Sequence, residues 1–220
     1  MKQENQLREE ICRVGASLFE RGYVHSTAGN ISARLDDGGM LITPTDACLG
    51  TLEPTRLARL SAEGEQISGE RASKTQALHR RIYATAAGSA CIIHTHSTHL
   101  VALSLSGVWQ QGDILPPITP YYVMKVGHVP LIAYHRPGDP AVITEVAQRI
   151  EAYAERGTPI RAVMLERLGP TVWSTSLAQA SAVLEELEET ARLWLLSNPK
   201  PAPLKPEQIE ALRREFGAVW

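Results

Sequence analysis

The sequence predicts an α/β or α+β protein in which helices are layered over a single sheet. Three observations support this fold class: apolar residues recur at helical spacing in several segments, short β-prone runs lie between them, and the two kinds of segment alternate irregularly without an internal repeat. The chain has 220 residues, of which 44% are hydrophobic and 21% charged. A chain of this length can bury one sizeable core, or two small ones. We expect one domain over residues 1–220.

Helical periodicity is clear near the N-terminus, where four apolar residues recur with charges between them: Leu7, Ile11, Val14 and Leu18. This pattern predicts a helix over residues 3–21. Capping residues mark two further helix starts: Ser73 precedes a helix expected over 74–87, and the pair Asp139-Pro140 begins another. The remaining helices are expected over 99–105, 174–196 and 207–216.

The helix expected over 174–196 carries an apolar face and an acidic run. The apolar face consists of Leu177, Ala180, Leu184, Leu187, Ala191 and Leu195. The acidic run consists of Glu185, Glu186, Glu188 and Glu189, and we expect it to point to water. Residues 198–206 contain four prolines and are expected to form a semi-rigid connector to the last helix.

The expected strands are short and bounded by turn residues. They are predicted at 31–35, 40–43, 90–96, 129–134, 160–165 and 171–173. The last two are separated by Gly169-Pro170, which we interpret as a break. Residues 52–70 show no strong period and indicate irregular surface around short strands, and residues 107–120 are expected to form a loop.

Charge, hydropathy and cysteine content argue against several classes of protein. The formal charge is −2, from 22 basic and 24 acidic residues, so nothing favours nucleic acid as a partner. No apolar run approaches the roughly 20 residues that a membrane span needs. The three cysteines are odd in number and widely separated, which is typical of reduced thiols. We therefore expect a soluble, cytoplasmic protein.

The segment that organises the chain ends in His94-Thr95-His96, after the apolar run Cys91-Ile92-Ile93. On a strand, alternation places His94 and His96 on one face. Two neutral imidazoles side by side suit a divalent metal such as zinc. The tripeptide alone is more often a pair of core or capping histidines, so the residues around it decide the interpretation.

Those surrounding residues resemble the class II aldolase/adducin family, and within it the 3-oxo-tetronate 4-phosphate decarboxylase branch, with L-fuculose-phosphate aldolase also similar. The resemblance covers nearly the whole chain. It depends on Ser26-Thr27-Ala28-Gly29-Asn30-Ile31-Ser32, Leu41-Ile42-Thr43-Pro44-Thr45, Ile93-His94-Thr95-His96-Ser97-Thr98, the segment from Thr119 to Pro130, Tyr134-His135-Arg136-Pro137-Gly138-Asp139, and the run from Leu184 to Ala191.

The resemblance implies a three-layer α/β/α fold with a central, largely antiparallel sheet, assembled as a homotetramer. It also implies a divalent metal, commonly zinc, held by three histidines, and a nearby acidic residue that acts as acid and base. His94 and His96 match two of the metal ligands. The phosphate-binding positions match Asn30, Thr45 and Ser73, and Lys74 matches a lysine of the decarboxylase branch.

Three positions depart from the family pattern. Thr75 stands where the family has its acid/base glutamate, and a threonine cannot take up a proton near neutral pH. Leu168 stands at the position of the third histidine and cannot bind a metal. Asp46 replaces a glycine of the phosphate loop and sets a like charge against a phosphate.

Other side chains could replace the missing groups. Glu166 lies two residues before Leu168, so on a strand it would share that face and could supply an oxygen ligand. Tyr122 is a candidate proton donor. The remaining candidates are His79, His128 and His135, for each of which we favour a surface or supporting role over metal binding.

Two functions therefore remain open. One is a metal-dependent lyase, a decarboxylase or aldolase, that acts on a small phosphorylated sugar or sugar acid and is attenuated by the departures at Thr75 and Leu168. The other is a non-catalytic homologue that binds a metabolite or a partner. In either case we expect a homo-oligomer, with the aromatic and proline-containing segment 107–125 as a candidate interface.

Overall fold

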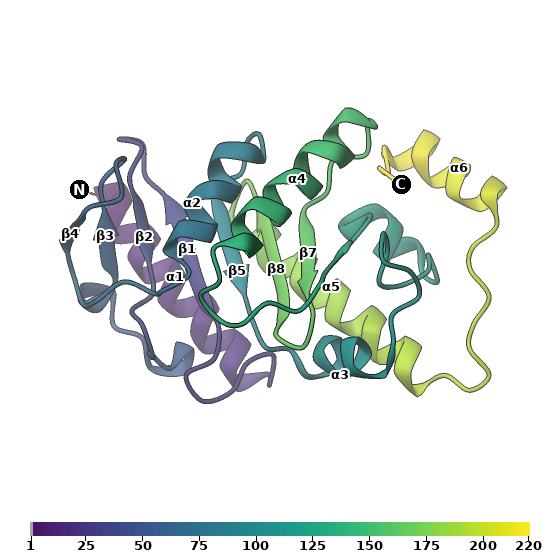
Figure 1. Ribbon diagram of the computed structural model, residues 1–220, viewed down its shortest axis with the longest axis horizontal. Coiled ribbons are helices and arrows are strands. Elements are labelled where there is room, and N and C mark those ends of the chain that lie inside the picture. The colour runs from purple at the N-terminus through teal and green to yellow at the C-terminus, as the bar shows by residue number, and fades with distance from the viewer. Residues whose placement is uncertain (1) are drawn as a thin grey trace. The chain divides into compact units, whose positions relative to one another are not determined.

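The structure is a computed structural model that describes residues 2–220, and it divides into two compact units (Figure 1). We name them unit 1, residues up to His96 together with Trp173–Ser181, and unit 2, residues Ser97–Val172 together with Ala182–Trp220. The chain passes from one unit to the other within strand β8, Gly169–Ser174, and helix α5, Leu177–Leu196. Within residues 2–220, no helix has the length and apolar character needed to cross a lipid bilayer.

Unit 1 is built on five antiparallel strands in the order β4-β3-β2-β1-β5. Their bounds are β1 Asn30–Arg34, β2 Met40–Ile42, β3 Ala58–Leu60, β4 Gln66–Ser68 and β5 Cys91–His94. The end of β8 also belongs to this unit, where the Ala90 N–H donates to the Ser174 carbonyl oxygen at 2.8 Å. Two 3₁₀ turns, Leu49–Thr51 and Pro54–Arg56, lie between β2 and β3.

Helices α1, Lys2–Glu20, and α2, Gln76–Thr85, pack on the two faces of these strands (Figure 1). The Ser32 hydroxyl reaches α2, so strand alternation turns Ile31 and Ala33 to the other face, where α1 packs. Ile31 and Ala33 are fully buried. The polar side chains of β1 therefore face α2, and that face carries the predicted site.

Unit 2 contains three short strands with helices around them. β6, Leu131–Ile132, pairs in parallel with β7, Ala162–Leu165, and β7 pairs antiparallel with the first part of β8. The helices of this unit are α3 Thr98–Ser106, a π-helical turn at Tyr122–Val126, α4 Ala141–Glu155, most of α5, and α6 Pro206–Phe216. Within each unit the strand pairing is largely antiparallel, with β6 and β7 as a parallel pair, in agreement with the sheet that the family resemblance implied.

Most expected elements are confirmed, with shorter strands and shifted ends. The helix after Ser73 begins at Gln76 and has Thr75, not Ser73, as its N-cap, so that part of the prediction was wrong. Ser73 still supports the helix start, because its hydroxyl accepts the Thr75 N–H at 3.4 Å and its carbonyl oxygen accepts the Gln76 N–H at 3.1 Å. Gly169-Pro170 was also misread, because both residues belong to β8 and pair with Leu165 and Met164. Glu166 and Leu168 do not share a strand face, since β7 ends at Leu165 and a turn follows, with Arg167 at φ 64°.

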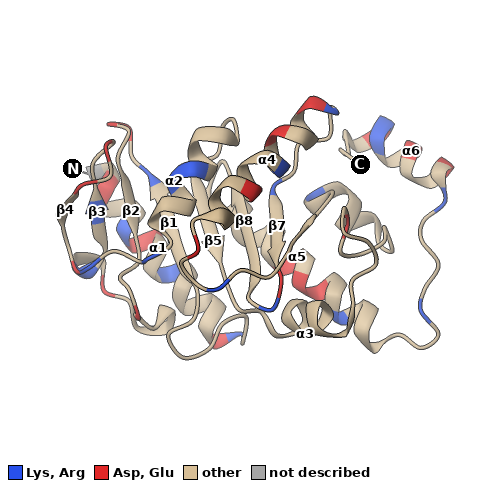
Figure 2. Cartoon of the chain, viewed as in Figure 1, with Lys and Arg blue, Asp and Glu red and all other residues tan. Residues whose placement is uncertain are grey.

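The expectation that the acidic run of α5 points to water was wrong for Glu188. Its side chain is buried, with 7% of the residue exposed. Its carboxylate accepts the backbone N–H of His99 at 2.8 Å and that of Leu100 at 3.0 Å, and it bonds the His99 ring nitrogen Nδ1 at 2.8 Å. Figure 2 shows the acidic residues gathered on the middle of α5. The carboxylate thus supplies acceptors to the unpaired donors that begin α3.

Candidate active site

The predicted site residues of unit 1 meet where β5 ends beside β1. Asn30 and His94 are directly paired residues of these antiparallel strands, so their side chains leave the same face of the sheet. Both are buried, at 6% and 4% exposure. The Oδ1 atom of Asn30 has no hydrogen-bond partner among the described residues, which marks a buried acceptor open to a ligand.

The rings of His94 and His96 are spaced as two ligands of one ion. Their centres are 5.2 Å apart and their planes meet at 70°. With Zn–N bonds of ~2.1 Å and ring centres ~1.1 Å beyond each nitrogen, a tetrahedral angle separates two ring centres by ~5.2 Å. Burial and the nearby His25 lower the pKa of His96, which favours the neutral imidazole that binds metals. The histidine pair therefore fits a zinc-like ion.

Among the described residues, His94 and His96 are not joined by a third side chain at metal-binding distance. Within residues 2–220, no group of three His, Cys, Asp or Glu side chains is arranged to hold a metal ion. Two further histidines lie near the pair: His25, whose ring centre is 6.5 Å from that of His96, and the buried His79, which lies near His94. The sequence analysis did not select His25, although it directly precedes the Ser26–Ser32 motif.

The expected phosphate-binding residues lie on three neighbouring backbone segments of unit 1: the first begins β1 with Asn30, the second follows β2 and carries Thr45, and the third precedes α2 and carries Ser73. Thr43 joins the first two, because its N–H donates to the Ile31 carbonyl at 3.0 Å and its hydroxyl oxygen accepts the Ile31 N–H at 3.2 Å. Two backbone hydrogen bonds join the second segment to the third. The Thr45 N–H donates to the Arg71 carbonyl oxygen at 2.8 Å, and the Ser73 N–H donates to the Thr43 carbonyl oxygen at 3.2 Å. The segments that carry Asn30, Thr45 and Ser73 are thus held side by side.

Two charged residues flank these segments. Lys74 and Asp46 are both exposed. Asp46 has φ 56°, a left-handed conformation in which glycine carries no steric cost and aspartate is tolerated. This backbone position explains why a glycine suits it, and the aspartate adds a negative charge next to Thr45.

Thr75 and His79 lie one helical turn apart at the start of α2. Thr75 is half-buried, and its hydroxyl is 3.0 Å from the Ser73 hydroxyl. His79 is fully buried, with Nδ1 bonded to the Ser32 hydroxyl at 2.7 Å and Nε2 unpartnered among the described residues. Burial, with the nearby His94, lowers the pKa of His79 to about 3, so its ring is neutral at physiological pH.

The other predicted candidates belong to unit 2. The Glu166 carboxylate accepts the Tyr134 N–H at 2.9 Å, and Leu168 lies in the turn before β8. Tyr122 is fully buried, and burial raises its pKa well above the usual value, which opposes proton donation from it. His128 bonds Asp113 at 2.8 Å and His135 bonds Glu145 at 3.1 Å.

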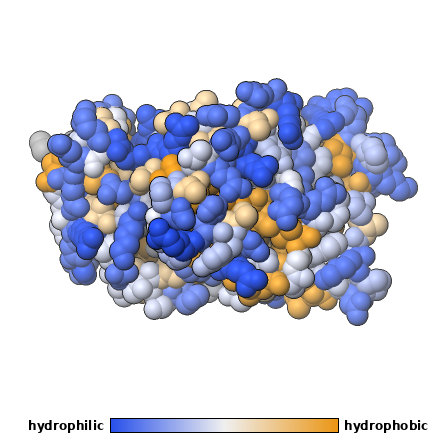
Figure 3. Space-filling view, in the orientation of Figure 1, coloured by the Kyte–Doolittle hydropathy of each residue, from blue (hydrophilic) through white to orange (hydrophobic). Residues whose placement is uncertain are grey.

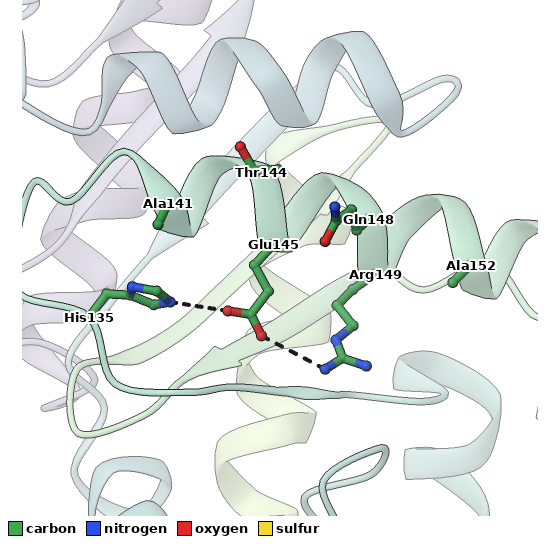
Figure 4. A pocket seen from close by; sticks show the side chains of 7 residues that line it. All are labelled: His135, Ala141, Thr144, Glu145, Gln148, Arg149 and Ala152. Atoms are coloured by element: carbon green, nitrogen blue, oxygen red, sulfur yellow. Dashed lines mark hydrogen bonds and ion pairs between the residues drawn. The ribbon is translucent and has the colours of Figure 1, made fainter.

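Unit 2 also has an open hollow of about 750 Å³ along α4 (Figure 4). Glu145 occupies its middle, between His135 at 3.1 Å and Arg149 at 3.8 Å. Its lining consists of His135, Ala141, Thr144, Glu145, Gln148, Arg149 and Ala152. The site residues expected in unit 1 take no part in it, and its one carboxylate is already paired with a histidine and an arginine.

Comparison with known proteins defines the class to which this fold and site belong. Residues 9–195 match the model of the Class II Aldolase and Adducin N-terminal domain family, and the chain belongs to that family. Both units fall largely within the match. Solved structures agree on the fold: an L-fuculose 1-phosphate aldolase has a TM-score of 0.80 with 23% identity over 96% of each chain.

Among individual proteins, the chain is similar to the 3-oxo-tetronate 4-phosphate decarboxylase of Cupriavidus necator, with 55% identity over all of both chains. The decarboxylase of the same name from Pectobacterium atrosepticum is 42% identical over 96% of this chain and 94% of the relative. The crystal structure of YgbL from Escherichia coli has a TM-score of 0.86, at 40% identity, covering 96% of this chain and 99% of that one. The resemblance read from the sequence motifs is thereby confirmed.

Proposed function

We propose that this protein is a metal-dependent lyase that decarboxylates a small phosphorylated sugar acid of the 3-oxo-tetronate 4-phosphate type. The observation that carries the proposal is the pair of His94 and His96 rings at the spacing of two zinc ligands, 5.2 Å, beside the buried Asn30. The 55% identity to a decarboxylase of that name supports the choice of substrate class. When bound, a divalent ion supplies Lewis-acid stabilisation of negative charge on a substrate oxygen.

In this proposal the three joined segments of unit 1 bind the phosphate. The Thr45 and Ser73 hydroxyls and the Asn30 amide donate hydrogen bonds to phosphate oxygens, and the exposed Lys74 ammonium adds a positive charge. The exposed Asp46 carboxylate opposes that charge, so we expect weaker phosphate binding than a glycine would allow.

Decarboxylation places a modest demand on the residues of this chain. In a 3-oxo acid, the bond between the carboxylate carbon and its neighbour breaks, carbon dioxide leaves, and the electron pair forms an enolate. A proton from water then completes the ketone product. No hydroxyl proton has to be removed first, as aldol cleavage requires, so Thr75 can occupy the acid/base position without abolishing the reaction. We therefore favour decarboxylation over aldol cleavage.

A second candidate function is metabolite binding without turnover. It is favoured by one observation: position 75 is a threonine, which has no group that titrates near neutral pH, and its hydroxyl bonds that of Ser73. Binding of a phosphorylated sugar acid without release of carbon dioxide would select this candidate.

The experiment is release of carbon dioxide from 3-oxo-tetronate 4-phosphate by the zinc-loaded protein and by two variants. We expect turnover above the uncatalysed rate in the wild type and its loss in His94→Ala, with His128→Ala as a control histidine outside the site. Wild-type protein that binds zinc and substrate but releases no carbon dioxide would contradict the lyase.

We further propose that the protein acts as a homotetramer, without nucleic-acid or membrane partners. Leu105, Trp109 and Tyr121 of unit 2 expose 57%, 39% and 58% of their surface, and Figure 3 shows apolar surface over the region of α3. Apolar and aromatic surface of this kind suits an interface. Sedimentation equilibrium should give four chains per particle, and Tyr121→Arg should shift the particle toward smaller species.

The same proposal places the protein in the cytoplasm. Cys12, Cys48 and Cys91 are free thiols, and such cysteines are typical of reducing compartments. Cell fractionation of the source organism tests this location.

A further inference from the structure

We propose that His25 is the third imidazole ligand of the ion that His94 and His96 hold, in place of the family histidine that Leu168 replaces. This inference rests on the proposed function, because it assumes that a zinc-like ion binds the pair. All three histidines belong to unit 1. The site would then be complete within one unit, and the loss of a histidine at position 168 would not abolish metal binding.

The ring spacings put His25 close to a ligand position. The His94 and His96 ring centres already have the ~5.2 Å separation of two tetrahedral zinc ligands. The His25 and His96 ring centres are 6.5 Å apart, with an angle of 73° between the rings, so the His25 ring must move ~1.3 Å closer to His96 and also come to the same separation from His94. His25 is exposed, so rotation of its side chain can change the position of the ring.

The backbone beneath His25 is held against the metal-binding strand. Val24, the preceding residue, is buried, with 3% of its surface exposed. Gly29 has φ 84°, and a Cβ atom there would lie 2.7 Å from the carbonyl oxygen of His94, so only glycine allows this approach. Between them, the Ala28 N–H donates to the His25 carbonyl at 3.0 Å and closes a turn. The loop is therefore anchored while its histidine remains free to turn.

Ligand chemistry favours His25 over the acidic alternative. Three imidazoles give a tetrahedral ion three protein ligands and one open position for a substrate oxygen, the arrangement of catalytic zinc sites. The carboxylate of Glu166 already accepts the Tyr134 N–H at 2.9 Å, so its use as a ligand would compete with that bond. The His25 ring would not have to give up a comparable backbone hydrogen bond.

The first test is zinc affinity, measured by calorimetric titration of chelator-stripped protein with zinc chloride. We expect His25→Ala to weaken zinc binding by at least roughly 10- to 100-fold, since a direct ligand should matter no less than an outer partner of one. His135→Ala, a histidine of unit 2 bonded to Glu145, is the matched control and should leave the affinity unchanged. Circular dichroism checks that each variant is folded.

The second test identifies the ligand directly. We expect Co²⁺-loaded His25→Cys to show a thiolate-to-cobalt charge-transfer band, whereas His135→Cys shows none. If His25→Ala and wild type bind zinc equally while His94→Ala loses it, the His25 assignment is wrong and the proposed metal site stands. If wild type binds no zinc at all, the metal-dependent function itself fails, and this assignment fails with it.

Discussion

At the scale of single residues, Thr75 is the change with the greatest chemical consequence. It precedes the first turn of α2 in unit 1, half-buried and bonded to Ser73 at 3.0 Å. Thr75→Glu should raise the decarboxylation rate by roughly 10²–10⁴-fold, because a carboxyl group there can transfer a proton during the reaction. Thr75→Gln is the matched control, with nearly the same shape but no carboxyl group that can act as an acid or a base. Equal rates for the two variants would show that the position lies away from the reacting atoms.

Asp46 offers a second residue-scale prediction, on phosphate binding. Asp46→Asn removes the charge but keeps a side chain that tolerates φ 56°. Its affinity for a phosphorylated sugar acid should improve by about 1–2 kcal/mol, through loss of a like-charge contact. Calorimetric titration of both proteins measures this directly. If both bind equally, the carboxylate points away from the phosphate, and Asp46→Gly distinguishes a backbone effect from a charge effect.

At the scale of elements, Glu188 joins α5 to the start of α3. Because it accepts two backbone N–H groups and bonds the His99 ring, Glu188→Ala should lower the free energy of unfolding by about 2–3 kcal/mol. Glu189 is the matched control: it makes a surface ion pair with Arg192 at 3.3 Å, so Glu189→Ala should change stability by less than about 0.5 kcal/mol. Urea unfolding of the three proteins decides this, and similar losses for both variants would contradict the capping role.

The same elements show how far sequence reasoning reaches. Helices α1, α5 and α6 were predictable because apolar periodicity is a local property of the chain. The inward turn of Glu188 was not, because it depends on donors of α3 that lie 89 positions away in sequence. The prediction of strand ends was wrong for a related reason. Whether Gly169 continues a strand or breaks it depends on its pairing with Leu165 on the neighbouring strand.

The candidate site shows the same division. His94, His96 and the segments proposed to bind phosphate were accessible through spacing and family motifs, and the structure brings Asn30 and His94 together as a strand pair. His25 was missed because its place beside His96 depends on how Gly29 packs against the backbone of His94, which no local pattern encodes. A histidine next to a motif loop is the only signal that the sequence offers.

At the scale of the whole molecule, the buried His79 makes stability depend on pH. Its pKa is about 3 in the folded protein against 6.5 when exposed, so the unfolded chain binds the extra proton. The contribution of His79 is therefore fully present above pH 6.5 and is lost as pH falls toward 3, at ~1.4 kcal/mol per pH unit. Urea unfolding in chelator between pH 4.5 and 6.5 should show a shallower slope for His79→Asn than for wild type. If the free energy of unfolding changes with pH by the same amount in both proteins, the His79 ring is not buried in its neutral form.

The most direct test of the central claim is the zinc dependence of decarboxylation. Chelator-stripped protein should release no carbon dioxide from 3-oxo-tetronate 4-phosphate above the uncatalysed rate. Added zinc should then raise the rate to a plateau at about one ion per chain, because the proposed site is a single histidine cluster in unit 1. A rate that stays at the uncatalysed level at every zinc concentration, or one that chelation leaves unchanged, would contradict the assignment of this chain as a metal-dependent lyase.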